Sequence, residues 1–147
     1  EYQDEESATM VFLNQDEIDY VSIGKDVFVY LPQSRNYKVS GFLKMWKSKL
    51  PSLLTKMNIK YFKAEEAKPF DLHEPKPDRL ERIMDNHFIM ISEEEVERVS
   101  SVKKLIKYLG AHSAELTEYA KKTDISSNDP NDMAELVNYY LQLEQAH

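Results

Sequence analysis

The sequence predicts a single α+β domain, and three observations support this fold class. Residues 20–31 are rich in β-branched and aromatic side chains, which favour strands. Residues 42–57 carry apolar side chains at helical spacing, and the last third of the chain contains three further helix-like stretches. A chain of 147 residues is long enough to bury a hydrophobic core without disulfides, and it has no cysteine.

The N-terminal part predicts a short tail followed by strands. Residues 1–7 are polar and lack periodicity, so we expect a mobile tail ahead of one domain that spans residues 8–147. A short apolar run follows at 10–13. Gly24 then lies between two strand-like runs, which predicts two or three strands with a turn at this glycine.

Residues 42–57 predict an amphipathic helix with a kink. At about 100° per residue, seven apolar side chains fall on one arc of about 120°, namely Phe42, Leu43, Trp46, Leu50, Leu53, Leu54 and Met57. Pro51 lies on the opposite face, so we expect it to kink or divide the helix. Lys47 borders the arc on one side, and Lys49 and Lys56 border it on the other, where their stems cover apolar surface.

The middle of the chain predicts a long loop and a β-hairpin. Residues 59–62 look like a strand, whereas residues 64–79 contain three prolines, which exclude a regular helix there. Residues 79–84 could form a helical turn. The apolar run 87–91 predicts a buried strand, and the acidic residues 93–95 would connect it to a return strand.

Three helices are predicted after the hairpin. A serine, Ser100 or Ser101, caps the first helix, which ends at Gly110. The second helix is expected to begin at Ser113. The third begins with Pro130 at the first helical position, where the missing N–H of proline has no intrahelical role.

The charges are segregated along the chain. Residues 1–34 hold eight acids and one base, residues 35–63 hold eight bases and no acid, and residues 64–147 hold eighteen acids and ten bases. These blocks sum to −7, +8 and −8, in a chain of net charge −7. Such segregation indicates that the basic middle contacts either the acidic ends of its own chain or an external anion.

Signals for enzyme chemistry are few. With three glycines the chain cannot build a Gly-rich phosphate loop. Ser22 with Lys25, and Ser101 with Lys104, match the Ser-x-x-Lys pattern of penicillin-recognising enzymes, but the companion motifs are missing. We therefore predict a turn and a helix cap at these serines, and no cofactor.

The four histidines lack the spacing of known zinc motifs, so we predict no metal site. An alternative hypothesis remains, in which Asp71, His73 and Asp85 of the 71–87 region serve a small metal-dependent hydrolase. A cleft that gathers these three residues with perturbed titratable groups would favour the enzyme, whereas scattered exposure would argue against it.

The lysines in and around the predicted helix are the candidate ligand-binding residues, namely Lys44, Lys47, Lys49 and Lys56. Their charge suits an anionic partner, either an acidic protein or an anionic membrane surface. Interleaved aromatic residues would also suit single-stranded nucleic acid. A pI near 5.1, and the position of Phe42 and Trp46 on the apolar stripe, argue against nucleic acid. The leading hypothesis is a non-enzymatic binding module, with the C-terminal helix around Tyr139 and Tyr140 as a second candidate surface.

In the C-terminal part, a short hairpin precedes a lysine-rich helix, a second helix, and a closing helix with Leu-Val-x-Tyr-Tyr at 136–140. This arrangement, over about residues 87–141, resembles the ending of uncharacterised secreted proteins of Bacteroidetes, although Gly110-Ala111-His112 replaces the charged link expected there. The resemblance implies a periplasmic, cell-envelope or secreted location, with a leader removed before Glu1, and it implies no activity. A cytoplasmic location stays open, since a chain without cysteine fits both compartments.

Overall fold

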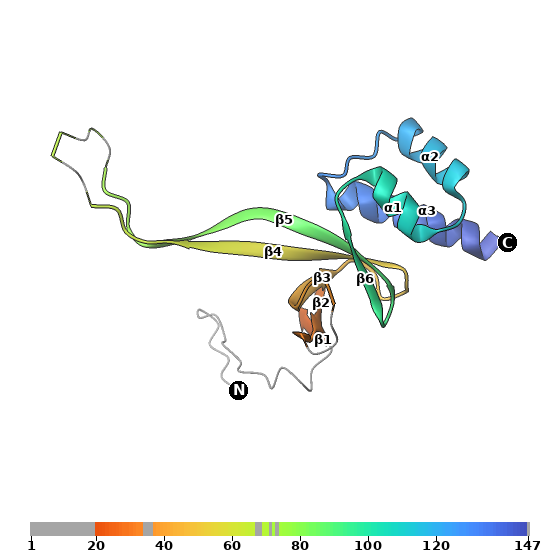
Figure 1. Ribbon diagram of the computed structural model, residues 1–147, viewed down its shortest axis with the longest axis horizontal. Coiled ribbons are helices and arrows are strands. Elements are labelled where there is room, and N and C mark those ends of the chain that lie inside the picture. The colour runs from red at the N-terminus through yellow and green to blue at the C-terminus, as the bar shows by residue number, and fades with distance from the viewer. Residues whose placement is uncertain (1–19, 34–36, 67–68, 71, 73, 147) are drawn as a thin grey trace.

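The computed structural model describes residues 20–33, 37–66, 69–70, 72 and 74–146. They form one antiparallel sheet in the strand order β1-β2-β3-β4-β5-β6, followed by three helices, which confirms the α+β class (Figure 1). The strands are β1 (Tyr20–Ile23), β2 (Asp26–Leu31), β3 (Gly41–Met45), β4 (Ser52–Phe62), β5 (Arg79–Ser92) and β6 (Glu95–Val99). The helices are α1 (Val102–Leu109), α2 (Ser113–Lys122) and α3 (Pro130–Ala146). The expected tail at 1–7 and the apolar run at 10–13 lie outside the described residues.

Strands β1 and β2 form the hairpin that the sequence predicts, with Gly24 in the connection at a φ of 59°. A positive φ is readily adopted by glycine because it has no Cβ. In β2 and β3, alternate residues are buried, as Val29 and Leu31 and then Leu43 and Met45 show. This alternation is typical of strands with one face on a core.

The kinked helix predicted for residues 42–57 is wrong. This segment is β3, a connection that contains Pro51, and the first half of β4. The helical spacing arose because β4 is buried on both faces: Leu53 packs in the cluster beneath the helices, and Leu54 packs in the cluster on the opposite face. A strand covered on both sides carries a continuous apolar run, which periodicity cannot distinguish from a buried helix.

The helical turn predicted for residues 79–84 is also wrong, because these residues are the first half of β5. The sequence does not alternate here, since two charged residues separate Leu80 from Ile83, and the strand is defined by the pairing of β5 with β4 along this length. Strand β5 then continues through the buried residues His87–Met90 and pairs with β6. Glu93 and Glu94 connect the two strands.

The distal halves of β4 and β5 project from the body of the molecule as a two-stranded arm (Figure 1). The arm begins after a register shift between Lys56 and Asn58, and within the described residues it pairs with no third strand. Several of its large apolar side chains are exposed, among them Ile59, Tyr61 and Leu80. The three prolines predicted to exclude a helix lie in the connection at its tip.

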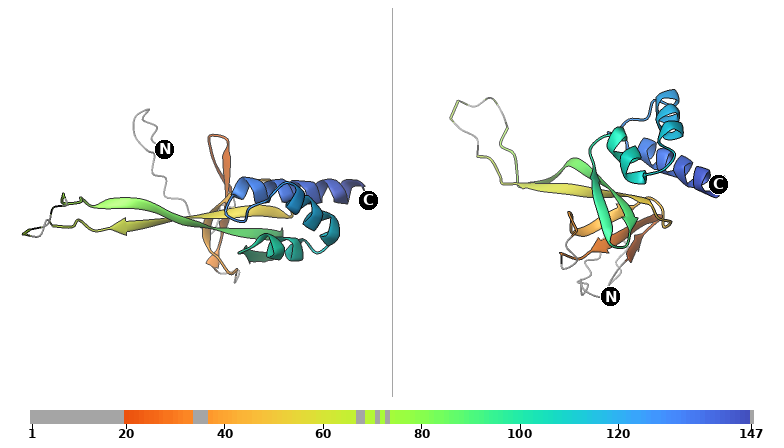
Figure 2. Two further views of the ribbon diagram at one scale, coloured as in Figure 1. Left: turned by 90° about the horizontal axis from the view of Figure 1, so that it is seen from above. Right: turned by 45° about the vertical axis from the view of Figure 1, so that its right-hand side comes forward.

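Two apolar clusters sit on opposite faces of the central strands. One lies between the sheet and the helices, where Leu53, Ile89 and Val99 meet Leu105, Leu116, Leu136 and their neighbours. The other is enclosed where the sheet curls and β1–β3 fold beneath the proximal halves of β4 and β5 (Figure 2), and it includes Val29, Leu43, Leu54, Phe88 and Met90.

The helices begin near the residues that the sequence predicts. The Ser101 side chain accepts a hydrogen bond from the Lys104 N–H at the start of α1, and Gly110 ends that helix at a φ of 81°. Helix α3 begins at Pro130, and the Asp132 carboxylate in its first turn accepts a hydrogen bond from the Ser126 N–H. On α3, Tyr140 is buried in the cluster beneath the helices, and Tyr139, which is partly buried against the same cluster, stacks on Tyr119 with ring centroids 4.1 Å apart.

Candidate functional site

A cleft of about 580 Å³ lies beside the only tryptophan of the chain. Its walls come from the β1–β2 connection, the end of β3 with the residues that follow it, and the start of α3, and consist of Lys25, Asp26, Val27, Lys44, Met45, Trp46, Lys47, Ser48 and Asn131. Three lysines and one carboxylate line this space, so its charge is positive in a chain of net charge −7. We call it the lysine cleft.

Lys44 is held at one side of the lysine cleft by two contacts. Its Nζ lies 3.2 Å from the Asp26 Oδ1 and 4.3 Å from the centroid of the Trp46 ring. A cation over an indole face is attracted by the negative face of the ring, while the carboxylate neutralises part of its charge. The ammonium group is therefore positioned, and an incoming anion would compete with Asp26 for it.

The other three predicted lysines differ in their surroundings. Lys47 lines the lysine cleft, and Lys49 is exposed in the β3–β4 connection. Neither has an ion-pair partner in the part of the chain that the structure describes. Lys56 instead crosses Gly41 and donates a hydrogen bond from Nζ to the Ser40 carbonyl at 2.7 Å. The structure thus brings two of the four predicted lysines into one cleft, and the lysine-flanked helix that was to carry them is absent.

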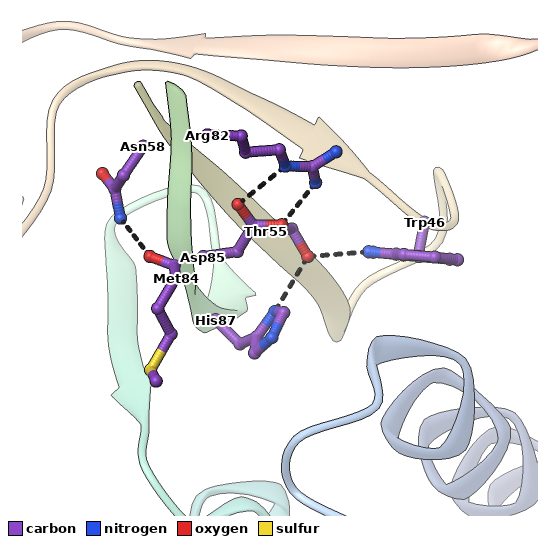
Figure 3. A network of polar contacts seen from close by, with 7 residues as sticks. All are labelled: Trp46, Thr55, Asn58, Arg82, Met84, Asp85 and His87. Atoms are coloured by element: carbon purple, nitrogen blue, oxygen red, sulfur yellow. Dashed lines mark hydrogen bonds and ion pairs between the residues drawn. The ribbon is translucent and has the colours of Figure 1, made fainter. Parts of the chain in front are cut away.

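Behind the lysine cleft, a chain of polar contacts links Trp46, which directly follows β3, to residues of β4 and β5 (Figure 3). The Trp46 Nε1–H donates to the Thr55 Oγ1 at 2.9 Å, and the Thr55 Oγ1 lies 3.0 Å from the His87 Nδ1. Thr55 is 3% exposed and His87 is 9% exposed, so water is hardly available to either side chain as another hydrogen-bond partner. Because the hydroxyl accepts from the indole, its own proton is free to be donated to an unprotonated Nδ1.

A second cleft, of about 480 Å³, opens on the other side of this network and includes Asp85, His87, Arg98, Ser127 and Pro130 in its lining. Burial lowers the pKa of His87 below its ordinary value because the imidazolium is poorly solvated there, while the negative charges of Asp85 and Asp129 act in the opposite direction. Two hydrogen bonds from Arg82 hold the Asp85 carboxylate and lower its pKa.

The hydrolase alternative gains no support from this second cleft. Of its three residues only Asp85 is described, because Asp71 and His73 lie outside the described residues. Asp85 is engaged by Arg82, and the Nδ1 of the neighbouring His87 is engaged by Thr55. Among the residues that the structure describes, no three acidic or histidine side chains gather as a metal site requires.

The buried His87 predicts a dependence of stability on pH. Its pKa in the folded state is lowered below 6.5, the ordinary value that applies to the unfolded chain. Between the folded-state pKa and 6.5 the unfolded chain binds more protons than the folded chain, so the free energy of unfolding rises with pH. We expect stability to fall on acidification through 6.5 and this effect to level off below the folded-state pKa. The measurement is urea unfolding at a series of pH values for the wild type and for His87→Gln, which should lose less stability over this interval. If the free energy of unfolding changed equally with pH in the two proteins, His87 would not be the source of this pH dependence.

Sequence reasoning missed Lys25, Asp26 and Asn131 as walls of the lysine cleft. The signal that could have located the first two was the pairing of β2 with β3, since Val27 lies opposite Met45 and brings the preceding turn beside Lys44 and Trp46. Asn131 had no such signal, because its position depends on how α3 packs on the sheet.

In the described part of the chain, no helix is both long and apolar enough to cross a membrane. Comparison of the chain with protein-family models, with curated proteins and with solved structures found no match.

Proposed function

We propose that this chain is a non-enzymatic binding module that takes an acidic segment of a partner protein into the lysine cleft. The observation that carries the proposal is the convergence of Lys25, Lys44 and Lys47 on one concave space beside Trp46. Three ammonium groups around a cleft suit carboxylates that reach into it from an extended side chain or a chain terminus. The location at the cell envelope that the C-terminal resemblance implies is part of this proposal.

The shape of the site favours an acidic protein over a membrane surface. A lipid surface is flat and engages basic residues that project outward together with apolar residues that insert. Here Lys44 lies inside the cleft, against Trp46 and Asp26, with its side chain 24% exposed. Groups in that position are reached by a protruding carboxylate more readily than by the face of a bilayer.

The test is the affinity of the full chain for an oligo-glutamate peptide, measured by calorimetry at low and at moderate salt. The variant Lys25→Gln, Lys44→Gln, Lys47→Gln should lose binding by about tenfold or more, because three short-range charge interactions are removed. The matched control replaces three exposed helix lysines, Lys103, Lys104 and Lys121, with glutamine. It changes the net charge equally and should bind nearly as tightly as the wild type.

Asp26→Asn provides a second arm of this test. Since Asp26 is the carboxylate that Lys44 contacts, its removal frees an ammonium group and lowers the negative charge of the site. We expect tighter binding of oligo-glutamate, with a steeper dependence on salt. Equal losses in the cleft and control variants, or binding to anionic vesicles in preference to the peptide, would overturn the proposal.

A further inference from the structure

The arm formed by β4 and β5 has an open edge on β5. Strand β6 pairs with β5 only from His87 onward, so in the described residues no strand covers the outer edge from Arg79 to Asn86. An uncovered strand edge presents a row of backbone N–H and C=O groups and is a ready template for another strand. Proteins usually protect such edges, and here the edge lies at the end of an arm that projects away from the helices (Figure 2).

The cross-strand register gives the arm one apolar row. Tyr61 lies opposite Leu80, so their side chains share a face, and both are exposed, at 57% and 71%. On the other face, Lys60 lies opposite Glu81 and Phe62 lies opposite Arg79. The apolar row ends at the uncovered β5 edge with Leu80.

The charged residues on either side of Leu80 have opposite signs, so a two-fold rotation about Leu80 places each of them opposite a residue of the other sign in a second copy. A symmetric antiparallel pair of β5 strands requires one residue to face its own copy, with all others paired at equal distances on either side. If Leu80 faces its copy, then Arg79 faces Glu81 twice. Asp78, which precedes β5 and accepts hydrogen bonds from Tyr61 and Ala64, then faces Arg82, which is paired with Asp85. Arg79 and Glu81 already form an ion pair within the strand, so the dimer would join the two pairs into a ring of alternating charge.

The other edge of the arm lacks this complementarity. From Asn58 to the end of β4 the only charged residue is Lys60, and Lys63 follows directly after the strand. A symmetric pair of β4 strands would therefore gather positive charges and no negative charge. Centring a β5 pair one residue either way on Glu81 or Arg79 would place like charges opposite each other.

We propose that two copies of this chain associate through their β5 edges, with Leu80 on the two-fold axis. The strands then lie in the order β4-β5-β5-β4 where Arg79, Leu80 and Glu81 of one copy pair with the same three residues of the other. Residues 82–86 of each β5 run along residues 74–78 of the other copy, which precede its β5. The row Tyr61–Leu80 of one copy continues into the Leu80–Tyr61 row of the other. Because each arm projects away from its own body (Figure 1), the antiparallel arrangement leaves the two bodies at opposite ends of this sheet.

The first test is a charge swap, read as the dissociation constant of the dimer by sedimentation equilibrium. Glu81→Arg alone and Arg79→Glu alone each place like charges opposite one another, and each should raise the dissociation constant by about tenfold or more. The double variant restores opposite charges across the axis and should return to the wild-type value. Failure of the double variant to recover association, or a wild-type chain that stays monomeric at high concentration, would overturn the proposal.

The second test locates the axis by cross-linking, which a chain without cysteine permits directly. Residues that face each other in an antiparallel pair have Cα atoms about 4.5–5.5 Å apart, within the range that a disulfide spans. Leu80→Cys should therefore oxidise rapidly to a covalent dimer, whereas Tyr61→Cys, one strand further from the axis, should stay monomeric. Equal rates in the two variants, or faster cross-linking at position 61, would contradict the β5 edge.

Discussion

Leu53→Ala and Leu54→Ala should each lower the free energy of unfolding by about 2–5 kcal/mol, because both side chains are almost completely buried, at 1% and 0% exposed. Leu53 contributes to the cluster under the helices, and Leu54 contributes to the cluster enclosed by β2 and β3. Two adjacent residues with equally large effects are expected only when a strand is covered on both faces.

The measurement is urea unfolding of each variant, with Ile23→Ala as the matched control, because Ile23 is an aliphatic strand residue that is 66% exposed. The control should change the free energy of unfolding by less than about 0.5 kcal/mol. A small effect at either Leu53 or Leu54 would mean that one face of β4 is less well covered than the structure indicates.

Thr55→Val should destabilise the fold by about 1–3 kcal/mol, although valine has nearly the same shape as threonine. The substitution removes the acceptor for the Trp46 Nε1–H and the donor for the His87 Nδ1. Neither partner is fully exposed, so neither regains a full hydrogen bond to water at no cost.

The matched control for this prediction is Thr117→Val on α2, where the hydroxyl donates to the Ser113 carbonyl at the surface. That substitution also exchanges threonine for valine, but it leaves no buried group unpaired, so its effect should be small. Equal destabilisation by the two substitutions would show that the Trp46–Thr55–His87 network contributes nothing beyond the change of side-chain type.

The sequence predicted elements well where burial is one-sided and caps are present. Ser101, Gly110 and Pro130 mark helix ends by local hydrogen bonding and backbone preference, which depend little on the rest of the fold. Gly24 marks a turn for a similar local reason. The class and the C-terminal helices followed from such signals.

The sequence misled where tertiary contacts decide. Leu53 and Leu54 lie in a strand with a core on each side, so their apolar run imitated a helix face. In the arm, Leu80 and Ile83 are exposed and the pattern lacks the regular burial that identifies a strand. Of the candidate site, Lys44 and Lys47 could be chosen from charge alone, whereas the contribution of Lys25 required the β2–β3 pairing.

The most direct test of the lysine cleft uses Trp46, which is the only tryptophan in the chain and lines the cleft itself. Its fluorescence should change in a saturable manner when oligo-glutamate is added, and added salt should reverse the change, because the charges that attract the peptide are screened. Lys25→Gln with Lys47→Gln should shift the response to several-fold higher peptide concentrations while leaving Lys44 and the indole in place. An unchanged response in that variant, or peptide binding without any change at Trp46, would contradict the proposed function.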